Sequence, residues 1–251
     1  MKKYPKTEKY DNDWILENWM GPNPLILLEE VCEHFDLKPG MKVLDMGCGK
    51  GLTSIFLAKE YGVTVFANDL WIGATENLKR FEEAGVSDKV YPIHAEAHAL
   101  PYAHGFFDAA IAIDCYHYFG ACENYFIDVF SKLVKPGGQF GIVVPGLKCE
   151  FEKGYPDTLE ELWLPELHTL HSNRWWRKLW EKTGLCEILA CYDIDEPKAI
   201  WQPWADWSKE NFAKELGDID HESGGADFDV RFLAADTNND IALVALVARK
   251  R

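Results

Sequence analysis

The first two-thirds of the chain alternates short apolar runs with amphipathic segments, and this alternation constrains the fold most. The apolar runs have the length and composition of strands at residues 43–46, 63–67, 90–93, 107–113 and 139–144. Segments between them carry apolar residues at helical spacing, at 52–61, 72–84 and 124–133. The run at 107–113 is continuous rather than alternating, as is typical of a strand covered on both faces. The pattern predicts βαβ units around a parallel sheet, and therefore an α/β fold.

The last third is less regular but still suggests ordered elements. We expect a helix over 172–182 with Ser172 as its N-cap, a strand at 186–192 and a helix over 201–216. Residues 230–235 and 241–249 flank the turn-forming segment 236–240, which predicts a hairpin. No linker divides the chain. We therefore expect one domain, with an N-terminal lid and helices in 1–40, a binding core in 41–146, and a cap insertion with C-terminal strands in 147–251.

A glycine-rich loop, Gly47-Cys48-Gly49-Lys50-Gly51, follows the first predicted strand and precedes a helix. Glycines in this position remove Cβ atoms, so a ligand can lie against bare backbone at the carboxyl ends of the strands. A dinucleotide site needs Gly-x-Gly-x-x-Gly, and its last position would here be Leu52. Asp45, two residues before the first glycine, suits an ammonium group better than a pyrophosphate.

A second acidic residue, Asp69, ends the second predicted strand, eighteen residues after Gly51. A carboxylate at this place can accept hydrogen bonds from both hydroxyls of a ribose. The alternative is that the glycines and Asp69 only serve turns. The glycine loop and Asp69, each at the end of a predicted strand, together favour a nucleoside site.

Residues 42–144 resemble the class I S-adenosylmethionine-dependent methyltransferases, because four motifs match in order. The resemblance implies that Gly47, Cys48, Gly49 and Gly51 contact the methionine part of the cofactor. It implies that Asn68 and Asp69 hold the ribose, with Leu70 and Trp71 against the adenine. Glu96, beside Ala97, occupies the place of the aspartate that bonds the adenine amino group, and Asp114 lies beside the transferable methyl. The family fold is a seven-stranded, mostly parallel sheet with an antiparallel last strand and helices on both faces.

The charge of the chain agrees with a cationic ligand. The formal net charge is −15, and Asp45, Asp69, Glu96 and Asp114 would surround a cofactor whose net charge is about +1. A surface so negative disfavours nucleic acid and anionic membranes as partners. The N-terminus has no apolar stretch of a secretory signal, and the seven cysteines are irregularly spaced. We therefore expect a cytoplasmic protein with a small-molecule substrate and no nucleic-acid or membrane partner.

The methyl acceptor is expected beside the residues that follow the fourth strand, Tyr116-His117-Tyr118. Small-molecule members of the family often carry a histidine here, so His117 is the best match for a base, and a shift of one residue favours Tyr118. The alternative is that this cluster packs beneath the cap. Ten tryptophans could hold an amine through cation–π contacts, although packing of the cap explains them more simply.

The sequence thus predicts methyl transfer from S-adenosylmethionine to a nitrogen, oxygen or sulfur of a small molecule, an amine among the candidates, with S-adenosylhomocysteine as product. No metal is predicted, because the histidine pairs 94/98 and 168/171 have no third ligand. Two rival functions remain open. One is a regulatory module that binds the cofactor without turnover, and the other is a cyclopropane-forming lipid enzyme.

Overall fold

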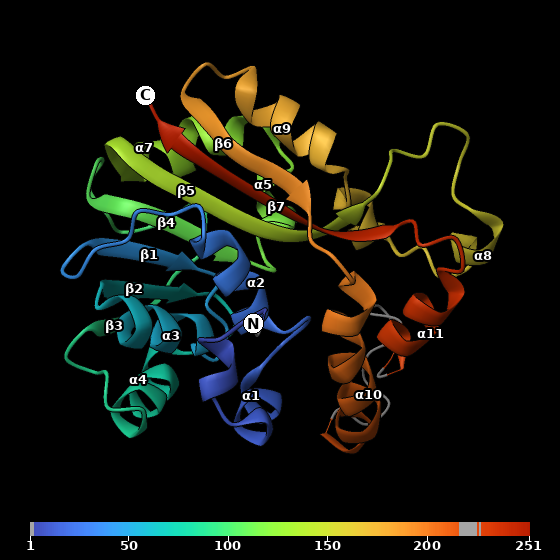
Figure 1. Ribbon diagram of the computed structural model, residues 1–251, viewed down its shortest axis with the longest axis horizontal. Coiled ribbons are helices and arrows are strands. Elements are labelled where there is room, and N and C mark those ends of the chain that lie inside the picture. Colours follow the sequence, from blue (N-terminus) through green and yellow to red (C-terminus); the bar gives the residue numbers. More distant parts are fainter. Residues whose placement is uncertain (1–2, 216–224, 226) are drawn as a thin grey trace.

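The computed structural model describes residues 3–215, 225 and 227–251, and its centre is a seven-stranded sheet (Figure 1). The strands are β1 (Lys42–Met46), β2 (Thr64–Asp69), β3 (Val90–His94), β4 (Phe107–Ile113), β5 (Val134–Leu147), β6 (Cys186–Asp193) and β7 (Ile241–Lys250). Their order is β3-β2-β1-β4-β5-β7-β6. Strands β1 to β5 pair in parallel, whereas β7 is antiparallel to both neighbours. The predicted α/β fold is confirmed.

Helices cover both faces of this sheet (Figure 1). One face carries α2 (Pro24–Cys32), α3 (Leu52–Tyr61) and α4 (Ala74–Glu83). The other carries α9 (Asn173–Glu181) and a helical run made of α6 (Glu123–Tyr125), the π-helix η2 (Phe126–Phe130) and α7 (Ser131–Leu133). Ser172 accepts a hydrogen bond from the Trp175 amide, so the predicted N-cap of α9 is confirmed.

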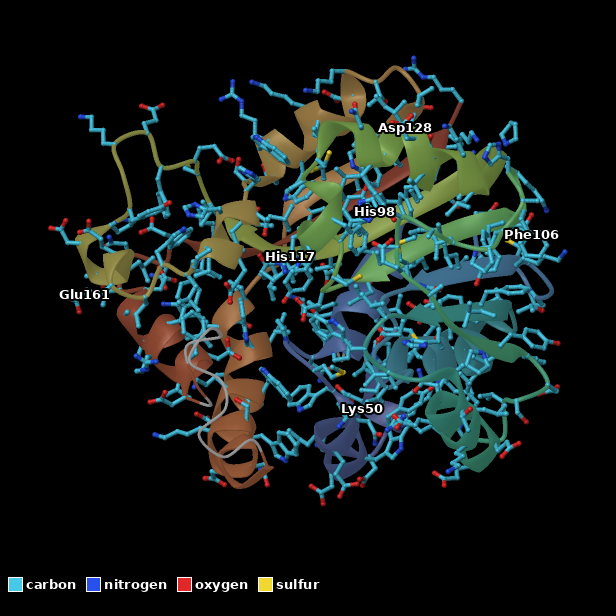
Figure 2. All side chains as sticks on the ribbon, turned by 180° about the vertical axis from the view of Figure 1, so that it is seen from behind. Lys50, His98, Phe106, His117, Asp128 and Glu161 are labelled. Carbon is cyan, nitrogen blue, oxygen red and sulfur yellow. The ribbon has the colours of Figure 1, made fainter. Side chains whose placement is uncertain are left out.

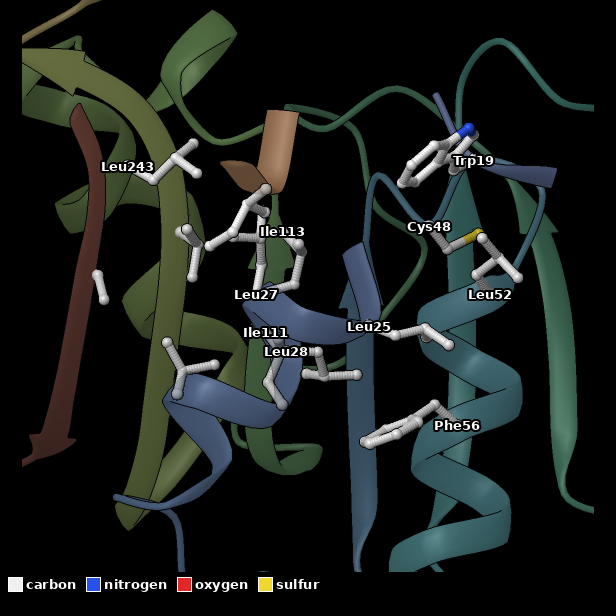
Figure 3. Close-up of a cluster of buried hydrophobic side chains, with 14 of the residues drawn as sticks. Trp19, Leu25, Leu27, Leu28, Cys48, Leu52, Phe56, Ile111, Ile113 and Leu243 are labelled. Carbon is white, nitrogen blue, oxygen red and sulfur yellow. The ribbon is translucent and has the colours of Figure 1, made fainter. Parts of the chain in front are cut away.

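The core consists of two hydrophobic clusters, one on each face of the sheet. Val43 and Ile111 point into the cluster under α2 and α3, whereas Leu44 points into the opposite cluster. Figure 3 shows the first cluster, where Leu25 and Leu28 of α2 lie near Phe56 of α3. Each such leucine, fully buried, contributes roughly 1.5–3 kcal/mol. Burial on both sides explains why β4 is apolar from Ala109 to Ile113.

The predicted hairpin at 230–249 is wrong. Residues 228–235 form the helix α11 (Phe228–Ala235), and both edges of β7 are occupied by β5 and β6. The buried Asp236 ends α11 and starts β7, because its carboxylate accepts hydrogen bonds from the amides of Asp240 and Ile241. The predicted helix at 201–216 corresponds to α10 (Pro197–Glu215), and Leu216 lies outside the described residues.

Several segments gather at the carboxyl ends of the parallel strands. They are α1 (Asn12–Asn18), α8 (Asp157–Glu160), η3 (Pro165–Thr169), α10 and α11, of which α10 and α11 lie beyond β4 in Figure 1, whereas η1 (Thr7–Lys9) packs beside α2 and the end of α3. Trp19, after α1, meets Trp204 of α10 edge-on at 6.2 Å between ring centroids. The Lys50 ammonium in the glycine loop donates to the Glu17 carbonyl oxygen at 3.0 Å. The N-terminal segment therefore packs against both the glycine loop and α10.

Candidate active site

A cavity of about 210 Å³ opens where the parallel strands end. Lys50, His98 and His117, labelled in Figure 2, come from the loops after β1, β3 and β4 and so mark this end of the sheet. The cavity is lined by most of the residues predicted to bind the cofactor: Gly47, Cys48, Gly49, Asn68, Asp69, Leu70, Trp71, Glu96, Ala97 and Asp114. Asp45 and Gly51 do not line it.

The glycine loop adopts a backbone that other residues resist. Gly47, Gly49 and Gly51 have φ angles of 66°, 53° and 83°. A Cβ atom on Gly47 would lie 2.5 Å from the Cys115 sulfur, and one on Gly51 would lie 2.4 Å from the Phe81 ring. Gly47 therefore lets the loop approach β4 closely. Gly51 instead allows the loop to pack against α4, behind the cavity.

Asp69 holds this loop in place. Its Oδ2 accepts from the Gly49 amide at 2.8 Å, and its Oδ1 accepts from the amides of Trp71 and Ile72, both at 2.8 Å. A carboxylate oxygen has two lone pairs, so Oδ2 can still accept one hydroxyl donor. Binding of a ribose through both oxygens would require Oδ1 to release one of its amides.

Asp45 lies behind the loop. Its Oδ2 accepts hydrogen bonds from the hydroxyls of Thr53 and Ser54, both at 2.6 Å, at the start of α3. Burial raises the pKa of Asp45 to about 6, although the two hydroxyl bonds oppose this shift. Asp45 therefore stabilises the junction of β1 and α3, and the structure gives it no direct access to the cavity.

Glu96 lies at the opposite wall and is paired with His98. The Glu96 Oε1 is 2.6 Å from the His98 Nδ1, and its Oε2 accepts from the His98 amide at 3.0 Å. The hydrogen bond from His98 lowers the pKa of Glu96, so the carboxylate is ionised at neutral pH. Beside it, Leu70 and Trp71 are exposed, Trp71 by 68%, and present an apolar surface at the cavity mouth.

The two residues predicted to serve the acceptor are placed differently. Tyr118, in the short helix α5 (His117–Gly120), lines the cavity and is 54% exposed. His117 is 5% exposed, does not line the cavity, and its ring lies 4.0 Å from that of Tyr118. Burial lowers the pKa of His117 to about 3, and its Nδ1 has no partner among the described residues. His117 is therefore a neutral imidazole behind Tyr118.

The comparisons with known proteins agree with this geometry. Residues 43–138 match the family described as "Methyltransferase domain". Over these residues the chain is similar to methyltransferase domains. The resemblance to class I S-adenosylmethionine-dependent methyltransferases is thereby confirmed, and the matched segment contains the glycine loop, Asp69, Glu96 and Asp114.

Similar proteins extend the match beyond this segment. The chain is 27% identical over 183 residues to a sterol methyltransferase-like protein of Botryococcus braunii, covering 67% of this chain and 44% of the relative. It is 27% identical over 208 residues to a phosphoethanolamine N-methyltransferase of Zea mays, covering 77% and 38%. The chain thus spans less than half the length of these relatives.

A solved structure shares the fold. Geranyl diphosphate C-methyltransferase from Streptomyces coelicolor aligns with a TM-score of 0.66 and 14% identity, covering 90% of this chain and 80% of the other. That structure is a complex with Mg²⁺, geranyl diphosphate and S-adenosyl-L-homocysteine. The expected cofactor, S-adenosylmethionine, agrees with the product bound in this neighbour.

The cavity is completed by residues that the sequence did not assign individually. Asn18, Trp19, Met20, Pro22 and Pro24 line the cavity from the N-terminal segment. They precede β1, so no strand end positions them, and only the segment as a whole could be expected to close over the site.

The described residues contain neither a metal-ligand cluster nor a helix that could span a membrane. No group of three or more histidine, cysteine or acidic side chains in the described ranges could hold a metal ion. Of the helices in those ranges, none is long and apolar enough to span a membrane.

Proposed function

We propose that the protein transfers a methyl group from S-adenosylmethionine to a nitrogen, oxygen or sulfur atom of a small molecule, without a metal. One observation carries the proposal. The cavity joins the bare backbone of the glycine loop, the Asp69 carboxylate and the apolar surface of Trp71 at the carboxyl ends of β1 and β2. A reducing compartment such as the cytoplasm belongs to the proposal, since all seven cysteines are unpaired.

The residues present fit the parts of this cofactor. Asp69 Oδ2 keeps a lone pair for a ribose hydroxyl, and the exposed Leu70 and Trp71 offer an apolar surface for a base. Glu96 is ionised and can accept from an exocyclic amino group. Gly47, without a Cβ, leaves backbone open to the polar tail, and Asp114 supplies negative charge beside it.

When bound, the cofactor supplies a methyl group already activated on a sulfonium. The chain therefore has to hold the acceptor in line with that methyl and keep water out. The N-terminal segment covers the glycine loop, where the sulfur of Met20 would lie 3.1 Å from a Cβ on Gly49. Tyr118 is one of the side chains after β4 that an acceptor would meet, with Asp114, Cys115 and Phe119. In this proposal Tyr118 contacts the acceptor, and His117 supports its ring from behind.

A carbon acceptor is the second candidate, because a protein with the same fold is named geranyl diphosphate C-methyltransferase. The named acceptors of similar proteins also include phosphoethanolamine, which is methylated on nitrogen according to that protein's name. An amine is the acceptor class that we favour within the proposal, since the cavity is rich in carboxylates.

Calorimetry with S-adenosylmethionine, S-adenosylhomocysteine and NADH tests the cofactor. We expect binding of the first two and none of NADH, and the reverse result would overturn the proposal. Incubation with acceptor mixtures then measures formation of S-adenosylhomocysteine. Binding without turnover of any amine, alcohol, thiol or alkene would favour a regulatory module, and turnover only with phospholipid vesicles would favour a cyclopropane-forming enzyme.

A further inference from the structure

The acceptor end of the cavity contains an uncompensated carboxylate. Asp114 follows β4, lines the cavity and is partly buried, with a left-handed backbone at φ 59°. In the described part of the chain, no hydrogen-bond donor or cation compensates its side chain, whose pKa is raised well above the usual value by burial. Gly21 covers it closely, since a Cβ there would lie 1.9 Å from Asp114 Oδ2.

A second carboxylate, Asp229 of α11, does not line the cavity but lies behind Trp204, which packs on the cavity-lining Trp19. Its Oδ2 accepts from the indole nitrogen of Trp204 at 2.9 Å, and burial raises its pKa. The negative charge of Asp229 also contributes to the raised pKa of Asp114, so the two carboxylates interact. Both act on Tyr118, together with the exposed Glu166 of η3. Acidic residues of three different segments thus contribute negative potential at one tyrosine.

Aromatic rings form the remaining walls. Trp19 is 3% exposed and lines the cavity, and it meets Trp204 edge-on. Across the opening, Tyr118 meets Trp71 edge-on at 5.9 Å between ring centroids. Carboxylates next to aromatic faces are the combination that binds substituted ammonium groups, through Coulomb attraction and cation–π contacts.

We propose that the acceptor end of the cavity binds an organic cation of the substituted ammonium class, with Asp114 as the counter-charge in the cavity, Asp229 adding negative potential from behind Trp204, and Trp19 and Tyr118 as walls. The inference rests on the proposed function, because it concerns the same cavity. A neutral apolar acceptor would leave the Asp114 carboxylate desolvated without a partner, which is costly. An anionic acceptor would be repelled by the negative potential of both residues.

This assignment also fits the charge movement of amine methylation. An amine that enters as its ammonium ion has no free lone pair, so it first releases a proton to solvent. The nitrogen lone pair then forms the new C–N bond, the sulfur keeps the electron pair of the broken C–S bond, and the positive charge passes from sulfur to nitrogen. A primary or secondary amine afterwards releases a further proton to solvent, whereas a tertiary amine does not. Asp114, which lines the cavity, stabilises the positive charge on nitrogen.

The test compares choline with its neutral isostere 3,3-dimethylbutan-1-ol by calorimetry, on the full chain saturated with S-adenosylhomocysteine. We expect choline to bind at least about tenfold more tightly. Asp114→Asn should remove most of that preference, and Asp229→Asn should reduce it while leaving the affinity of the neutral alcohol unchanged. Asp227→Asn is the matched control, since Asp227 precedes α11, faces solvent and pairs with Arg231 at 3.2 Å.

Equal affinities of the parent protein for choline and the alcohol would overturn the inference without need of any variant. So would an equal loss of choline affinity in Asp227→Asn and Asp229→Asn. Failure of S-adenosylhomocysteine to bind would instead overturn the proposed function. The two failures are therefore distinguishable in the same titrations.

Discussion

Replacing His117 by phenylalanine should change how the stability of the protein depends on pH. Burial lowers the pKa of His117 from 6.5 to about 3, because the ring is 5% exposed and no partner binds its Nδ1 in the described chain. Below pH 6.5 this ring is protonated in the unfolded chain, whereas in the folded protein it stays neutral until the pH approaches 3. The contribution of His117 to stability is therefore present above pH 6.5 and is lost as the pH falls toward 3.

The size of the effect follows from the two pKa values. One pKa unit corresponds to about 1.4 kcal/mol, so the penalty at pH 4 is about 3 kcal/mol relative to pH 8. A phenylalanine keeps the ring and its contact with Tyr118 but cannot take up a proton. Any constant cost of the substitution cancels when the two proteins are compared at two pH values.

Urea unfolding of both proteins between pH 8 and pH 4 measures this difference. The free energy of unfolding of the parent, minus that of His117→Phe, should fall by about 3 kcal/mol over this range. His104→Gln is the control, because His104 is exposed and its replacement should give no such trend. A difference that stays constant with pH would refute the buried neutral imidazole.

The same variant separates two roles in the reaction. A general base typically contributes roughly 10²–10⁴-fold to the rate. Because His117 does not line the cavity, we expect turnover of His117→Phe within about fivefold of the parent, well below that range. A loss of two orders of magnitude, with unchanged affinity for S-adenosylhomocysteine, would instead identify His117 as the base.

Further substitutions test the loop and its supports. Asp69→Asn places an amide donor against the amide of a loop residue that Asp69 now accepts from. Calorimetry should show at least about tenfold weaker binding of S-adenosylhomocysteine, and thermal unfolding should show a loss of roughly 1–3 kcal/mol in stability. Unchanged affinity would contradict the role of Asp69 in holding the loop and the ribose. Gly51→Ala should destabilise by roughly 1–3 kcal/mol more than Gly154→Ala, since both have positive φ but only the former meets Phe81. The parent should lose up to about 3 kcal/mol of its free energy of unfolding between pH 3.8 and pH 6, because buried Asp45 ionises only near pH 6 in the folded protein. Asp45→Asn should not show this loss. If urea unfolding gave the same difference between the two proteins at pH 4 and at pH 7, the raised pKa of Asp45 would be excluded.

Most residues expected to contact the cofactor line one cavity, because the strand order brings the ends of their strands together. Asp69 and Glu96 follow β2 and β3, and the carboxyl ends of neighbouring parallel strands meet at one edge of the sheet. Asp45 shows the limit of this reasoning. It lies inside β1, on the same face as Val43, so its side chain points beneath α3 rather than beyond the strand end. Proximity to the motif in sequence did not reveal that direction.

A shift of one residue along α5 decides which of His117 and Tyr118 faces the cavity. Successive residues of a helix point about 100° apart, so in α5 one side chain faces the cavity while its neighbour faces the protein interior. The motif fixed the location of this pair after β4 but could not choose between its members. The hairpin prediction failed for a related reason, because turn-forming residues after α11 bind Asp236 and connect a helix, rather than a strand, to β7.

The acceptor end differs from the cofactor end in how it is assembled. Trp19 comes from the N-terminal segment, Asp114 from the end of β4, and Asp229 from α11, so the three meet only in the folded protein. A local motif cannot encode such a set, since each member alone has an ordinary structural explanation. Substrate choice can therefore change by substitution in the lid and α11 while the glycine loop and Asp69 stay the same.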